Sequence, residues 1–120
     1  MDIINLGLVE PFTTKDGSEI RELLAHRNSC IKNQTLAEAR LAPGATTTAH
    51  HHVRTEEIYY ILEGEGLMTI DAEQKIVCAG DAVAIPPGAV HQIHNRGNVL
   101  LKFLCCCAPG YEHDDTILAE

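Results

Sequence analysis

The sequence predicts an all-β domain, either a sandwich or a barrel. Short segments rich in β-branched and apolar residues recur at intervals of about 8 to 12 residues, and turn residues separate them. No long stretch has the period of 3.6 residues that an amphipathic helix requires. The expected strands in the second half of the chain are residues 58–62, 67–70, 75–78, 82–85, 90–94 and 99–107.

The first third of the chain is less clear. Residues 15–18, KDGS, are typical of a hairpin turn because Asp-Gly readily supplies positive φ. Residues 18–24 have helix-favouring composition but are short and bounded by turn signals, so we interpret them as a strand, and residues 35–41 have the same ambiguity between helix and strand. The tail, residues 109–120, fits a short helix beginning near residues 114–115 or a loosely ordered end.

Length and charge narrow the classes of function. The 120 residues correspond to a single domain, residues 1–120. The 9 basic and 17 acidic side chains give a net charge of −8, which disfavours binding to nucleic acid or an anionic membrane surface. No apolar run approaches the roughly 20 residues of a membrane span, and no signal peptide precedes the domain, so we expect a cytoplasmic protein.

The five cysteines do not predict disulfides. Their number is odd, and Cys105, Cys106 and Cys107 are consecutive, which prevents unstrained bridges between neighbours. Cys30 and Cys78 stand alone, and no zinc-type CxxC pattern is present. Free thiols are consistent with a reducing compartment.

The histidines at positions 50 and 52 are the strongest chemical signal. On a strand, residues i and i+2 point to the same face with Cα atoms roughly 6.6 Å apart, so both imidazoles can reach one ion. On a helix the same pair would diverge by about 200°. The β-branched and aromatic residues that follow, 58–62, favour the strand and therefore a two-histidine clamp.

Two motifs in residues 44–64 and 80–95 give the chain a specific resemblance: it is similar to cupins. Every fixed position of both family motifs is present, and 15 residues separate the motifs. The first motif is met by Gly44, His50, His52, Glu57 and Gly64, and the second by Gly80, Pro86, Gly88, His91 and Asn95.

The resemblance implies a double-stranded β-helix, the jelly-roll barrel of cupins, with four metal ligands that point inward: His50, His52, Glu57 and His91. Three imidazoles and a carboxylate suit a divalent transition metal, namely Fe, Mn, Ni, Zn, Co or Cu, with about two positions left for a ligand. The spacing to Gly64 favours Glu57 as the acidic ligand, whereas the alternative spacing selects Glu56, on the opposite strand face.

Other side chains have weaker claims. Tyr59 is in phase with Glu57, so its hydroxyl is a candidate catalytic proton donor, with a simple core role as the alternative. His51 and His94 are out of phase with the expected ligands and should face away. His26 and His113 have no supporting pattern.

The last expected strand and two arginines complete the candidates. Cys105 and Cys107 should line the interior because the alternate face carries Lys102, with apolar packing as their default role. Arg21 and Arg40 would hold an anionic substrate if they pointed inward, but charged side chains more often face solvent.

These features favour a metalloenzyme acting on a small polar substrate, of dioxygenase or isomerase/lyase type. The alternatives are a non-catalytic module that binds a metal or small molecule, and a purely structural dimerisation unit, since fold does not fix function. Apolar outer strand faces and edge strands near the N-terminus predict a homodimer.

Overall fold

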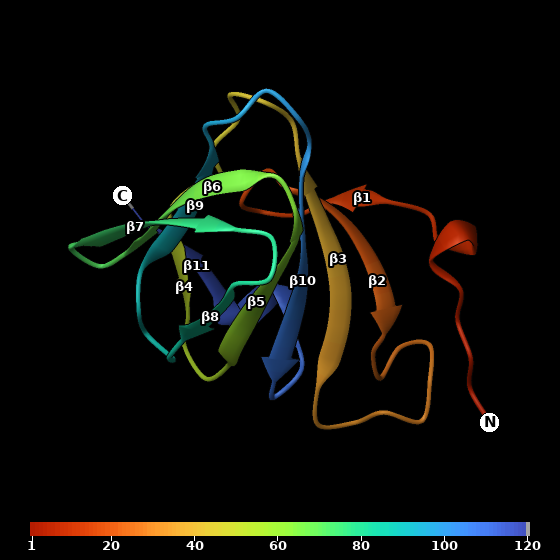
Figure 1. Cartoon of the computed structure of the whole chain (residues 1–120). Coiled ribbons are helices and arrows are strands. Elements are labelled where there is room, and N and C mark those ends of the chain that lie inside the picture. The colour runs from red at the N-terminus through yellow and green to blue at the C-terminus, as the bar shows by residue number, and fades with distance from the viewer. Residues whose placement is uncertain (120) are drawn as a thin grey trace.

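The computed structural model describes residues 1–119, whose regular secondary structure consists almost entirely of strands arranged in two antiparallel sheets (Figure 1). The six-stranded sheet has the order β1 (Phe12–Thr13), β2 (Glu19–Leu24), β3 (Thr35–Leu41), β10 (Leu101–Ala108), β5 (Glu56–Glu63) and β8 (Ala82–Ile85). The five-stranded sheet has the order β11 (Thr116–Leu118), β4 (His50–His52), β9 (His91–Asn95), β6 (Glu65–Ile70) and β7 (Glu73–Cys78). The predicted all-β class is therefore confirmed.

Helical structure in residues 1–119 is limited to two single turns, η1 (Leu6–Leu8) and η2 (His113–Asp115). The helix expected near residues 114–115 is thus one 3-10 turn, and the chain then forms β11, a strand the sequence analysis missed. β11 has only three residues, too few to show a period, and it forms because β4 offers an unpaired edge. No helix in residues 1–119 is long and apolar enough to cross a membrane.

The alternation of side chains along the central strands explains the core. In β5, buried and exposed residues alternate from Glu56 to Leu62, and β10 alternates buried with half-buried residues from Leu101 to Cys107. One face of each strand therefore points between the sheets. The core residues gathered there are Ala39, Leu41, Tyr59, Ile61, Met68, Val77, Ile85, Ala89, Ile93, Leu101, Phe103 and Cys105.

Two residues named by the motifs have structural roles. Gly64 joins β5 to β6 with φ +87°, and a Cβ there would lie 2.7 Å from the Leu100 carbonyl oxygen. Asn95 is fully buried, and its amide nitrogen donates to the carbonyls of Leu41 (2.9 Å) and Val99 (2.8 Å). Its oxygen accepts from the Gly97 N–H. These positions hold turns around the barrel rather than a ligand.

The strand register brings the chemical residues together. In the five-stranded sheet, His50 on β4 is opposite His91 on β9, and His52 is opposite Thr116 on β11. In the six-stranded sheet, Glu57 on β5 is opposite Cys107 on β10. Because facing residues in a ladder lie on the same side of the sheet, both groups point into the space between the sheets.

Candidate metal centre

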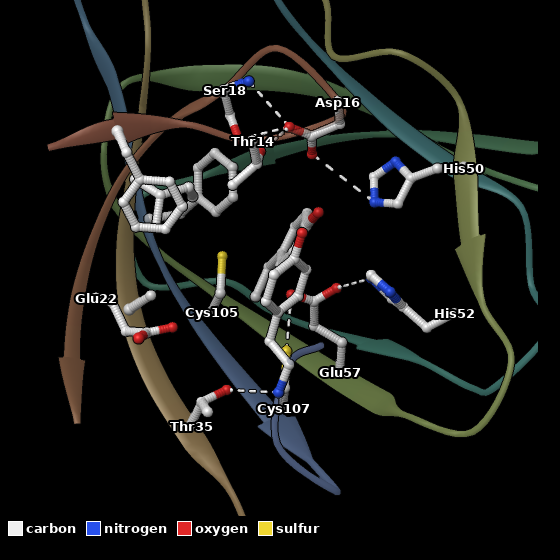
Figure 2. Close-up of a pocket in the computed structure, with 16 residues that line it drawn as sticks. Thr14, Asp16, Ser18, Glu22, Thr35, His50, His52, Glu57, Cys105 and Cys107 are labelled. Carbon is white, nitrogen blue, oxygen red and sulfur yellow. Dashed lines mark hydrogen bonds and ion pairs between the residues drawn. The ribbon is translucent and has the colours of Figure 1, made fainter. Parts of the chain in front are cut away.

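A cavity of about 50 Å³ lies between the two sheets and is open to solvent (Figure 2). Since one buried water needs roughly 10–15 Å³, this volume admits a few waters or one small molecule. Its walls come from both sheets and from the loops before β2 and after β10. The lining residues are Phe12, Thr14, Asp16, Ser18, Ile20, Glu22, Thr35, Ala37, His50, His52, Glu57, Tyr59, Phe103, Cys105, Cys107 and Tyr111.

Three histidines form a compact group on the five-stranded side. One ring nitrogen each of His50, His52 and His91 lies within 4.8 Å of the other two, and all three side chains are buried. The ring centroids of His50 and His91 are 4.3 Å apart, as expected for residues facing each other across a ladder. Three imidazoles at this separation can share one ion.

Backbone carbonyls orient two of these rings. His50 Nδ1 lies 2.8 Å from the Thr48 carbonyl oxygen, and His91 Nδ1 lies 3.0 Å from that of Ala89. A carbonyl only accepts hydrogen bonds, so each Nδ1 carries the proton and each Nε2 presents a lone pair. Burial, and then the neighbouring His91, lower the pKa of His50, which favours this neutral form.

The third ring is held by the C-terminal tail. His52 Nδ1 lies 3.1 Å from Thr116 Oγ1, and that hydroxyl donates to the Glu112 carbonyl oxygen at 3.2 Å. Because the hydroxyl proton is donated to the Glu112 carbonyl, Thr116 Oγ1 accepts a hydrogen bond from His52 Nδ1. All three histidines therefore direct an unprotonated Nε2 toward the same point. Metal-binding histidines are commonly held in this way, with Nδ1–H bonded to an acceptor and Nε2 free for the ion.

Glu57 reaches this group from the six-stranded sheet. Its Oε1 lies 3.1 Å from His52 Nε2 and 3.6 Å from His91 Nε2, and its Oε2 accepts from the Cys107 thiol at 3.2 Å. Burial opposes its charge, but the neighbouring imidazoles of His52 and His91 outweigh burial and lower the pKa of Glu57 to about 2. The side chain is therefore a carboxylate at neutral pH.

The group has an unmet requirement for a positive charge. Within residues 1–119, His91 Nε2 is the one buried side-chain nitrogen or oxygen atom without a hydrogen-bond partner. His52 Nε2 presents a lone pair to the Glu57 carboxylate, so two acceptors face each other. A cation at this point would accept the free lone pair of His91 Nε2 and separate the two facing acceptors. Three imidazoles with a carboxylate fit a divalent transition metal better than Mg²⁺ or Ca²⁺, which prefer all-oxygen sites.

A second carboxylate, which the sequence analysis treated only as part of a turn, faces the histidines from another side. Asp16 lies in the loop between β1 and β2, and its Oδ2 is 3.7 Å from His50 Nε2. Figure 2 shows Asp16 beside His50 and Glu57 beside His52. The predicted turn at residues 15–18 is present, with Gly17 at φ +89°. Nothing in the local sequence signals that this turn borders the cavity.

Tyr59 and the two cysteines expected to face inward all line the cavity. Tyr59 is 3% exposed, and its ring packs against Phe103 with centroids 4.6 Å apart. Burial, and then the charge of Glu57, raise the pKa of Tyr59 and of Cys105 well above their ordinary values. The same two causes raise the pKa of Cys107. These groups are hydrogen-bond donors, not anions.

The remaining histidine and glutamate candidates lie outside the three-histidine group. Glu56 is exposed whereas Glu57 is buried, which confirms that Glu57 is the inward residue of the pair. His51 is half-buried outside the three-histidine group, and His94 Nδ1 contacts Thr46 Oγ1 at an exposed position. His26 pairs instead with the side chain of Glu112.

The two arginines considered for an anionic substrate do not line the cavity. Arg21 pairs with Glu19 at 2.6 Å and Arg40 pairs with Glu38 at 2.5 Å, each partner lying two positions away on the same strand face. Their positive charges are therefore paired on the face of the six-stranded sheet that points away from the cavity. A role in holding substrate is wrong for both, because strand alternation turns them away from the interior.

The chain matches a family model described as a cupin domain over residues 37–107. It is 52% identical over 112 residues to a Methanocaldococcus jannaschii protein described as Uncharacterized protein MJ1618, covering 93% of this chain and 90% of that one. It is 36% identical over 86 residues to an oxalate-binding protein of Thermotoga maritima, covering 72% and 71% of the two chains.

A solved structure supports the same assignment. The structure of a Thermotoga maritima protein described as a predicted oxalate decarboxylase superposes with a TM-score of 0.78 at 29% identity, covering 90% of this chain and 99% of the other. The match of the family model includes His50, His52, Glu57 and His91. With two antiparallel sheets enclosing a three-histidine group, this chain belongs to the cupin family.

Proposed function

We propose that this cupin binds one divalent transition metal ion through His50, His52, His91 and Glu57. The observation that carries the proposal is the convergence of three Nε2 lone pairs, with each Nδ1 hydrogen-bonded and His91 Nε2 left without a partner. In the absence of a cation this buried polar arrangement would be unfavourable, because unpaired buried acceptors lose their hydration without compensation.

Metal analysis tests the site directly. Protein purified without chelators should contain about one equivalent of a transition metal. His91→Ala should remove most of this metal, because the ion then loses one of its three imidazole ligands. His51→Ala is the matched control, since it deletes a histidine that lies between His50 and His52 on β4 but outside the group. Equal loss of metal from both variants would contradict the assignment.

We further propose that the protein is an enzyme acting on a small polar substrate in this cavity. A bound divalent ion would supply Lewis acidity, polarising a substrate oxygen. The protein then limits substrate size through a cavity of about 50 Å³ and offers the Tyr59 hydroxyl as a donor to a substrate oxygen. These elements are compatible with an isomerase or lyase reaction.

The metal's identity separates the two classes of reaction. Zn, Mn, Co or Ni in the purified protein would favour the isomerase or lyase reaction, whereas Fe or Cu would favour the dioxygenase reaction, which needs a redox-active ion. Substrate-dependent oxygen consumption measured with an oxygen electrode is the second test. Oxygen uptake that vanishes in His91→Ala would refute a purely Lewis-acid role.

A non-catalytic binding module is the alternative function. It is supported by the 36% identity to the oxalate-binding protein and by a cavity large enough for only a small molecule. Isothermal titration of metal-loaded protein with oxalate, followed by recovery of the ligand, distinguishes the alternatives. Binding of candidate ligands that are always recovered unchanged supports the module, whereas turnover of any of them supports the enzyme.

A homodimer and a cytoplasmic location stay predictions. The outer face of β5 exposes Ile58, Tyr60 and Leu62, which are 49%, 42% and 40% exposed, and a second copy packed on this row would remove them from water. Sedimentation velocity at micromolar concentration should therefore report a dimer, and Tyr60→Glu should shift the population toward monomer. A wild-type monomer under these conditions would contradict the prediction.

A further inference from the structure

Asp16 is held in one orientation by its own turn. Its Oδ1 accepts from Thr14 Oγ1 at 2.6 Å, from the Ser18 N–H at 2.9 Å and from Ser18 Oγ at 2.7 Å. Its backbone oxygen accepts from the Thr48 N–H at 2.7 Å, which joins the turn to the segment just before β4, the strand that carries His50. Three donors on one oxygen fix the side chain, so the other oxygen has a defined direction.

That other oxygen faces the metal centre. Asp16 Oδ2 lies 3.7 Å from His50 Nε2, beyond hydrogen-bond distance, while the residue is only 9% exposed (Figure 2). It lines the cavity on the side away from Glu57. A ligand that occupies the cavity next to the histidines would therefore lie against a fixed hydrogen-bond acceptor.

The charges around the cavity single out this carboxylate. No lysine or arginine from the described chain lines the cavity. Glu22 is neutralised at the mouth by Arg27, with contacts of 2.9 and 3.2 Å, and Glu57 faces the histidines. Asp16 therefore directs a carboxylate oxygen into the cavity without an Arg partner such as Glu22 has, and on the side away from Glu57.

We infer that Asp16 determines ligand specificity, by accepting a hydrogen bond from an O–H or N–H group of the bound molecule and disfavouring ligands that present a second carboxylate there. The inference rests on the proposed function, since the ligand is placed beside the metal-binding histidines. A site that is built to hydrogen-bond a donor rejects an analogue without one, because its buried acceptor is then left unpaired.

The variant Asp16→Asn reverses the polarity with little change of shape. The asparagine oxygen can take the place of Oδ1 and accept the same three hydrogen bonds, which directs the NH₂ group to the position of Oδ2. The cavity then offers a donor where it offered an acceptor. Oxalate and oxamate are suitable probes because they have nearly the same shape, and oxamate replaces one carboxylate with an amide that donates.

The experiment is calorimetric titration of protein reconstituted with Mn²⁺. The ratio of the oxalate Kd to the oxamate Kd should fall at least tenfold from wild type to Asp16→Asn, because oxalate gains a donor and loses a repulsive charge. Mn²⁺ content, measured separately, should remain at one equivalent. Ser18→Ala, which removes one donor to Oδ1 and keeps the charge, should lower the ratio by about threefold.

Glu22→Gln is the matched control. It removes the same unit of charge from another cavity residue, but one already paired with Arg27, so the ratio should change by less than threefold. An equal effect of Glu22→Gln would overturn the inference in favour of a general charge effect.

The remaining outcomes separate this inference from the proposed function. Wild-type protein that takes up no Mn²⁺ or other transition metal would overturn the proposed function. Loss of Mn²⁺ from Asp16→Asn alone would show that Asp16 is a metal ligand and overturn the specificity role. An unchanged ratio, or no binding of either probe to the metal-loaded wild type, would also overturn it while leaving the metal site intact.

Discussion

The tail residue Asp115 should contribute substantially to stability, although the sequence predicted only a short helix or a loosely ordered end for residues 109–120. Asp115 is 4% exposed and accepts from the Arg54 and Thr55 backbone N–H groups at 3.1–3.2 Å. Asp115→Ala leaves these donors without their acceptor, which costs about 1–3 kcal/mol. For a domain of this size the melting temperature should fall by about 5–15 °C. The Arg54 side chain is mostly exposed, so its ion pair adds little.

The effect should depend on pH. Burial opposes the charge of Asp115, but the N–H donors of Thr55 and Arg54 outweigh burial and lower its pKa. A lowered folded-state pKa means that the stabilisation is complete above the ordinary value of about 4 and is lost as pH falls through the lowered pKa. The difference between wild type and Asp115→Ala should therefore be largest near neutrality and narrow in acid.

Differential scanning calorimetry between pH 3 and pH 7 measures both quantities. Asp114→Ala is the matched control, because Asp114 is the exposed neighbour in the same 3-10 turn. Its melting temperature should stay within about 2 °C of wild type, as expected for a surface substitution. The reasoning would be refuted if the two variants melted together, or if the deficit of Asp115→Ala were independent of pH.

Two further predictions concern the carboxylate ligand and the β5–β6 turn. Cys107→Ala removes the thiol donor to Glu57 and should weaken metal affinity about tenfold, measured by competition with a chelator. Cys106→Ala changes a cysteine on the outer face and should leave the affinity unchanged. Equal metal affinities of the two variants would contradict this prediction. Gly64→Ala should destabilise the fold in urea by several kcal/mol, and by more than Gly80→Ala. Both glycines have positive φ, but only Gly64 has a backbone oxygen 2.7 Å from the added Cβ, so equal losses would exclude the clash as the cause.

Much of the fold and of the three-histidine group could be predicted because local patterns specify them. The HxH spacing places His50 and His52 on one strand face in any strand, and alternation separates Glu57 from Glu56. Position 64 has a positive φ, which glycine adopts without strain, so the glycine in the sequence already indicates a turn there. These inferences need only neighbouring residues, and the structure confirms that His50, His52 and Glu57 point inward.

Other parts of the site depend on contacts between distant segments. Thr116 supports His52 across 64 residues, and Cys107 contacts Glu57 across 50 residues. No periodicity or motif in the tail indicates these pairs, because they arise from strand order and register. The short strand β11 was missed for the same reason, since pairing with β4 rather than propensity makes it extended.

The sequence alone determined the alternation of inward and outward side chains, the glycine turns and the pairing of His50 with His52, because each follows from backbone geometry over a few residues. His91 was added only by the resemblance to the cupin motifs. Tertiary structure alone decided that Asp16 borders the cavity, and that Arg21 and Arg40 do not. A turn has no periodic face, so its side chains acquire a direction only from what packs against it. Here the Thr48 N–H bound to the Asp16 carbonyl provides that direction.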